Sequence, residues 1–159
     1  MNDADAYRDA MARHANGVAV VSTAGEEGFR GLTASSVASV SLSPPLLLVC
    51  IDSATITRDV IAATGKFNVN FLAREQEFLA DRFSGRAPLV DPSWREVPHR
   101  LGDNGLPLIG GCVAWVECSL EQLHEGGDHE IAVGRVTAAA AGAGDPLVYW
   151  DRSFWTLSR

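Results

Sequence analysis

Short apolar segments, each ended by glycine, proline or polar residues, recur along most of this sequence. They predict about seven strands, at 18–22, 29–33, 46–51, 67–71, 112–123, 130–139 and 147–157. Polar, glycine-containing turns separate the first two strands and also the fifth and sixth, which predicts hairpins. Strands repeated at this spacing favour a closed barrel or a sandwich over a parallel α/β sheet.

Helical periodicity is confined to short stretches at 6–14, 58–64 and 74–83. Asp3 and Asp5 can cap the first helix, and Gly65 is suited to end the second. The run 85–111 is rich in proline and glycine, so we expect a long loop or several short pieces there. We therefore expect one mainly β domain over residues 1–159, with two or three short helices.

The apolar run at 46–51 contains no polar residue, unlike the alternating strands elsewhere. A strand of this kind is typical of burial on both faces, and we expect that here. Pro44 and Pro45 precede it and lack backbone donors, so strand pairing is expected to stop at them.

The overall charge limits the partners that such a chain can bind. Its 13 basic and 20 acidic residues give a formal charge of −7, which repels nucleic acid and anionic membranes. No basic-then-apolar leader and no apolar run of about 20 residues occurs, so a cytoplasmic location is expected. The three cysteines include no CxxC pair, which argues against a disulfide framework or zinc site and favours buried apolar thiols.

Several familiar nucleotide and catalytic motifs are absent from the sequence. There is no Walker A loop and no GxSxG elbow, and the GxG at 142–144 is followed by Asp145-Pro146, which forbids the helix of a Rossmann fingerprint. His124 and His129 give only a weak metal pattern. Any dinucleotide must therefore bind without a dedicated nucleotide-binding domain.

Four segments could contact a flat, phosphate-bearing ligand, and each also has a plain structural reading. Segment 31–36 combines small residues with three hydroxyls, which suit the polar edge of a ring or an ordinary barrel strand. Segment 52–58 could hold a phosphate at a helix N-terminus or simply cap that helix. Segment 126–130 could direct His129 toward a ligand, or it could be a turn in which His129 has no function. Phe154 and Trp155 could pack against the aromatic ring of a ligand, or they could belong to the core or a dimer interface.

Taken in order, these segments resemble the flavin reductase-like family, whose members have an FMN-binding split barrel. The similarity is carried from Gly17 onward by several stretches in sequence: 17–22, 31–37, 40–50, 67–70, Gln76 with Phe83, 127–129, 134–136 and 146–149. The chain departs from many relatives at Leu32, Val37 and 150–152. The resemblance implies a six-stranded Greek-key split β-barrel that forms a homodimer.

The same resemblance implies a site for FMN or FAD at the dimer edge, with NADH or NADPH stacked on the flavin. Thr33, Ala34, Ser35 and Ser36 would line the isoalloxazine, and His129 would lie near the nicotinamide. The remaining implied cofactor-binding residues would follow the ring, ribityl chain and phosphate: Cys50, Ile51, Asp52, Ser53, Thr55, Arg58, Arg82 and Phe83.

The activity implied is hydride transfer from the reduced nicotinamide to the flavin, with reduced flavin supplied to a partner monooxygenase. The bound cofactors would carry the chemistry and the protein would orient them, so no general base is required. One alternative is a non-catalytic flavin- or haem-binding protein with the same barrel. An oxidase of the pyridoxamine-phosphate type fits less well, because it would need a denser set of cations than these 13 basic residues provide.

Overall fold

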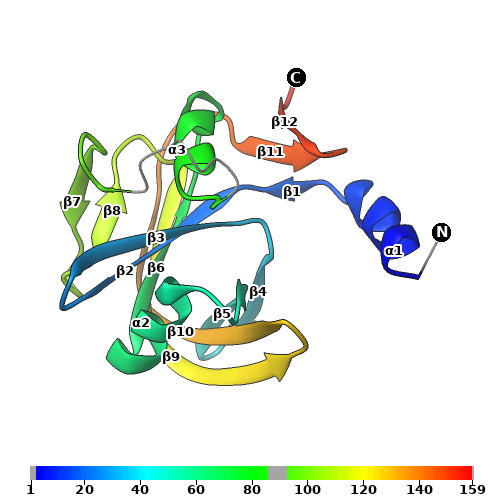
Figure 1. Ribbon diagram of the computed structural model, residues 1–159. Helices are drawn as coiled ribbons and strands as arrows, with labels where there is room; N and C mark the ends of the chain where they lie inside the picture. The colour runs from blue at the N-terminus through cyan, green and yellow to red at the C-terminus, as the bar shows by residue number, and fades with distance from the viewer. Residues whose placement is uncertain (1–2, 86–92, 159) are drawn as a thin grey trace.

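The main feature of the molecule is an antiparallel sheet that curls into a split barrel (Figure 1). The computed structural model describes residues 3–85 and 93–158. Seven strands follow the order β3-β2-β6-β9-β10-β5-β4, with bounds β2 (Ala19–Gly25), β3 (Gly28–Ala34), β4 (Val37–Leu42), β5 (Pro45–Asp52), β6 (Lys66–Phe71), β9 (Ala114–Gly126) and β10 (His129–Ala141). The edge strands β3 and β4 are separated in the chain by only Ser35 and Ser36, so the two edges of the sheet meet there. The expected mainly β split barrel is confirmed, with seven strands rather than six in its described main sheet.

The smaller elements surround this barrel. They are α1 (Asp3–Ala12), β1 (Asn16–Gly17), α2 (Ile56–Thr64), a 3₁₀ turn (Arg74–Gln76), α3 (Glu77–Arg82), β7 (His99–Leu101), β8 (Pro107–Ile109), β11 (Leu147–Trp150) and β12 (Ser153–Thr156). Gly65, with φ 70°, ends α2 as the sequence predicts. Thr55, within the predicted capping segment, caps the helix, which begins two residues earlier than predicted, at Ile56. In the long run 85–111, the pair β7–β8 confirms the expectation of short pieces, and residues 86–92 lie outside the described part. None of the described helices combines the length and apolar character needed to span a membrane.

The structure corrects two of the sequence expectations about where strands end. The segment 147–157 is a hairpin, not one strand, because Asp151 and Arg152 adopt φ values of 48° and 63° and reverse the chain. Strand pairing also does not stop at the two prolines, since Leu42 pairs with Pro45 across the β4–β5 turn.

Strand β5 is buried on one face rather than two in the single chain. Leu47, Val49 and Ile51 are buried, while Leu46, Leu48 and Cys50 between them remain partly exposed. The continuous apolar run therefore supplies the barrel interior from one face. Its other face offers an apolar surface to solvent or to another chain.

Two apolar cores hold these elements together. The barrel interior contains residues of β2, β5 and β6, among them Phe67, and α2 inserts Ile61 into it. The second core lies between β2 and α3 and includes Val20 and Leu79. Strand β2 is thus buried on both faces, and α3 is fixed next to the end of β3.

Candidate functional site

A cleft of about 360 Å³ opens at the end of β3, between α3 and the β11–β12 hairpin. It is lined by small, hydroxyl-bearing, charged and aromatic side chains: Val18, Thr33, Ser35, Ala80, Asp81, Ser84, Tyr149, Arg152, Ser153 and Phe154. Thr33 anchors its floor, because its hydroxyl donates to the carbonyl of Ala80 (2.7 Å) and its N–H to that of Phe83 (3.0 Å). A planar ligand with polar edges suits such a lining.

The corner between β3 and β4 continues from this cleft toward β5. The N–H of Cys50 donates to the carbonyl of Ser36 at 3.0 Å, which joins the two predicted ring-binding segments. Within those segments the side chains of Ala34 and Ile51 are buried in the barrel core. Only their backbone is available to a ligand, whereas Cys50 is partly exposed on the opposite face of β5.

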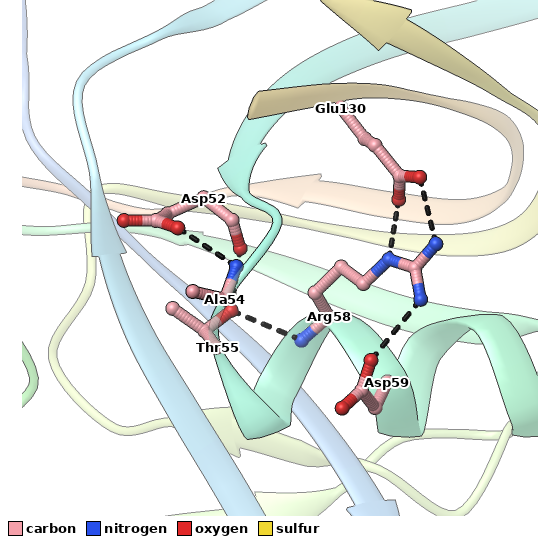
Figure 2. A network of polar contacts seen from close by, with 6 residues as sticks. All are labelled: Asp52, Ala54, Thr55, Arg58, Asp59 and Glu130. Atoms are coloured by element: carbon pink, nitrogen blue, oxygen red, sulfur yellow. Dashed lines mark hydrogen bonds and ion pairs between the residues drawn. The ribbon is translucent and has the colours of Figure 1, made fainter. Parts of the chain in front are cut away.

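The loop after β5 is shaped by its own hydrogen bonds (Figure 2). The carboxylate of Asp52 accepts from the N–H of Ala54 at 2.8 Å, and the hydroxyl of Thr55 accepts from the N–H of Arg58 at 3.3 Å. The N–H groups of Ile56 and Thr57, in the first turn of α2, have no hydrogen-bond acceptor in the described part of the chain. Such groups are suited to bind an anion.

Arg58, a predicted phosphate partner, already has two carboxylate partners. Figure 2 shows its guanidinium between Glu130 and Asp59. Its Nε and Nη2 donate to the two oxygens of Glu130, the latter at 2.7 Å, and its Nη1 donates to Asp59 at 3.1 Å. The hydrogen bonds from Arg58 lower the pKa of Glu130, so this carboxylate stays ionised at neutral pH.

His129 lies beside this loop. It is paired with Asp52 in the β10–β5 register, and the N–H of Ser53 donates to the carbonyl of Asp128 at 3.0 Å. The His129 side chain is 45% exposed, and its Nδ1 lies 2.7 Å from the Asp128 carboxylate. This hydrogen bond lowers the pKa of Asp128 and fixes one edge of the imidazole, leaving Nε2 for a ligand.

The last two predicted residues, Arg82 and Phe83, do not line the described cleft. Arg82 donates to the carbonyls of Ser93 and Arg95, at 3.2 and 2.8 Å. The ring of Phe83 is buried and packs on Trp94, with ring centroids 5.0 Å apart. Its contribution to the site is the backbone carbonyl that holds Thr33.

Sequence reasoning did not select several residues of the cleft, among them Asp81, Ser84, Tyr149 and Ser153. Asp81 and Ser84 flank the predicted pair Arg82-Phe83. Tyr149 and Ser153 enter the cleft because the chain reverses at 151–152. A single strand over 147–157 would not have placed them there together.

Two of the three cysteines, Cys112 and Cys118, are buried as expected, whereas Cys50 is partly exposed. Burial raises the pKa of both Cys112 and Cys118 to about 12, so their thiols are protonated at neutral pH. Across residues 3–85 and 93–158, no group of three or more His, Cys, Asp or Glu side chains could hold a metal ion.

Comparison with known proteins identifies the family. A family model described as "Flavin reductase like domain" matches residues 11–158. This chain belongs to the flavin reductase-like family. It is 36% identical over 160 residues to the FMN reductase (NADH) RutF of Cronobacter sakazakii, covering 100% of this chain and 96% of the relative.

Two further comparisons extend this result. A longer flavin reductase of Rhizobium meliloti is 40% identical over 137 residues, which cover 86% of this chain and 43% of the relative. The solved structure of BorF, the flavin reductase component of a bacterial two-component tryptophan halogenase, superimposes with a TM-score of 0.90 at 35% identity. That match covers 99% of each chain, so the family resemblance extends to the whole fold.

Proposed function

We propose that this chain is an NAD(P)H:flavin oxidoreductase that transfers a hydride from a reduced nicotinamide to FMN or FAD. The observation that carries the proposal is the link between three features. The cleft at Thr33 and Ser35 adjoins Ser36, whose carbonyl accepts from the N–H of Cys50 in β5. The loop after β5 leads to the first turn of α2, where the N–H groups of Ile56 and Thr57 have no acceptor among the described residues, and His129 pairs with Asp52 at the start of that loop. The naming of RutF as an NADH-dependent FMN reductase supports the same conclusion.

The described residues fit a flavin. Ser35 can present a hydroxyl to the polar edge of a ring, the Thr33 oxygen can still accept a hydrogen bond, and the N–H groups of Ile56 and Thr57 suit a phosphate. When bound, the flavin supplies the ring that accepts the hydride. The task of the protein is to hold the two rings stacked at reacting distance, and His129 contributes by contacting the nicotinamide.

We infer that the reduced flavin is passed to a partner monooxygenase or a related flavin-consuming oxygenase. The support is that BorF, which shares this fold along its whole length, is named as the reductase component of a two-component enzyme. The acidic surface of this chain, with its formal charge of −7, argues against nucleic acid as a partner.

We also infer that the protein works as a homodimer. Helix α1 has no buried residue and stands apart from the barrel in Figure 1, exposing Tyr7 and Met11. Leu42 is 89% exposed at the β4–β5 turn, next to the partly exposed apolar face of β5. Exposed apolar side chains of this kind are typical of surfaces that a second chain covers.

The proposal is tested by following nicotinamide oxidation by absorbance, crossing FMN and FAD with NADH and NADPH. Turnover that requires both an added flavin and a nicotinamide supports the proposal and identifies the preferred pair. Flavin or haem binding without any nicotinamide oxidation would instead support the non-catalytic binding protein.

A further inference from the structure

The Arg58 side chain is placed where it could meet a flavin phosphate, yet its charge is already balanced. Arg58 is the third residue of α2 and directly follows Ile56 and Thr57, whose N–H groups have no acceptor among residues 3–85 and 93–158. Its guanidinium makes three hydrogen bonds to the carboxylates of Glu130 and Asp59. A phosphate approaching this turn would have to compete with both carboxylates for the one cation.

The surroundings of Arg58 are negative overall. Its single positive charge faces Glu130 and Asp59, and the carboxylates of Asp52 and Asp128 lie on the adjoining loop and turn. The Glu130 side chain is only 13% exposed and that of Arg58 28%, so solvent screens this pair less than the other charges. Glu130 is therefore the carboxylate that most strongly holds the cation.

We propose that Glu130 is an affinity-determining residue that withholds Arg58 from the flavin phosphate, so that the phosphorylated flavin binds weakly and exchanges. This inference rests on the flavin site proposed above. The phosphate of FMN carries nearly two negative charges at neutral pH, whereas riboflavin has the same ring and no phosphate. The Glu130 carboxylate repels this phosphate and keeps Arg58 occupied, so it weakens FMN binding and leaves riboflavin binding nearly unchanged.

The deciding variant is Glu130→Gln, which removes the negative charge and keeps an oxygen that can accept from Arg58. Binding of FMN and of riboflavin is measured by quenching of flavin fluorescence at low salt. We expect the Kd for FMN to fall about tenfold, because removing one charge near a doubly charged phosphate in a solvated site changes Kd by about that factor. The Kd for riboflavin should change less than about twofold, because no phosphate is present.

Three further variants separate this effect from a general structural one. Glu121→Gln breaks a matched pair with Arg135 on the same hairpin, away from the α2 loop, and should change neither Kd. Asp59→Asn removes the more exposed carboxylate and should tighten FMN binding less than Glu130→Gln does. In the double variant Arg58→Gln/Glu130→Gln the gain in FMN affinity should disappear.

The outcomes distinguish this inference from the proposed function. If Glu130→Gln binds FMN no more tightly than the unaltered protein, or tightens FMN and riboflavin equally, Glu130 does not act through the phosphate and the inference is overturned. The reductase function would stand in that case, provided the unaltered protein still oxidises NADH with flavin. If the unaltered protein neither binds flavin nor oxidises NADH, both the reductase function and the inference about Glu130 are contradicted.

Discussion

His129 is the side chain on which the nicotinamide half of the site depends. It is half-exposed and held to Asp128, and it contributes no group to the cleft or to the first turn of α2. We expect His129→Ala to lower kcat/KM for the nicotinamide about tenfold, the loss typical of one positioning contact, while flavin binding is retained.

The matched control for this prediction is His124→Ala on the neighbouring strand β9. His124 is exposed and bonds Gln122 rather than the loop, so its removal should leave both properties unchanged. Complete loss of flavin binding in His129→Ala would contradict the role assigned to His129.

The buried thiols predict how stability depends on pH. In the folded chain the pKa of Cys118 is raised to about 12 by burial, whereas an unfolded thiol titrates near 9. Between these values the unfolded chain has lost a proton that the folded chain keeps, so the free energy of unfolding falls as pH rises from about 9 toward 12. Urea unfolding at several pH values should show this fall, and Cys118→Ala should reduce it; an unchanged slope would contradict the assignment.

At the scale of single residues, the sequence indicates where a side chain lies in the fold better than it indicates which side chain it pairs with. Thr33 and Ser35, selected for their hydroxyls, line the cleft, and their contact with the flavin ring stays a prediction. The pairing of Arg58 was not predictable, since Glu130 lies 72 residues away and meets it only through the β5–β10 register. Ala34 and Ile51 face the core because strand alternation fixes their side, which the resemblance alone did not resolve.

Strand β10 illustrates a constraint that acts on a whole element. A Cβ atom at Gly134 would lie 2.7 Å from Cζ of Phe67 and 2.8 Å from Cβ of Cys118, and the latter is fixed to the backbone of β9. Gly134→Ala should therefore force the strands apart and lower the free energy of unfolding by about 1–3 kcal/mol.

Urea denaturation measures this effect, with Gly17→Ala in β1 as the matched control. A Cβ at Gly17 would meet nothing within 4 Å. Equal stability of the two variants would show that β9, β10 and Phe67 are not packed as described.

The elements that sequence patterns predicted best are those with clear local signals. Helix α2 has a capping threonine and a terminal glycine, and the β2–β3 and β9–β10 hairpins have polar, glycine-containing turns. The β11–β12 turn was missed because Asp151 and Arg152, rather than glycine or asparagine, adopt its positive φ values. The half-exposed face of β5 was missed because apolar composition does not say which face another chain would cover.

At the scale of the whole molecule, the apolar surface around the β4–β5 turn predicts the oligomeric state. Leu42→Asp would place a charge where we infer that a second chain packs, and we expect at least about tenfold weaker dimerisation. Leu101→Asp on β7 is the control, because Leu101 is 54% exposed on a different part of the molecule.

Sedimentation equilibrium of the two variants beside the unaltered protein measures the effect. If Leu101→Asp dissociates the dimer and Leu42→Asp does not, the interface does not lie at the β4–β5 turn. A monomeric unaltered protein would contradict the dimer itself.

The barrel as a whole was predictable from strand spacing and from the missing Rossmann signal, and the resemblance supplied its split form. What local patterns could not give is the meeting of the two sheet edges at Ser35 and Ser36, which depends on long-range pairing. Backbone hydrogen bonds then join Ser36 to Cys50 of β5, and Ser53 of the α2 loop to Asp128 of the His129 turn. The proposed site is therefore a property of the closed barrel rather than of any one segment.

The most direct test of hydride transfer is an anaerobic titration of the protein with FMN and NADH. The account predicts that oxidised flavin absorbance is lost in step with NADH absorbance, one flavin for each NADH, and only when the protein is present. Flavin that stays oxidised while bound to the protein in excess NADH would contradict the account.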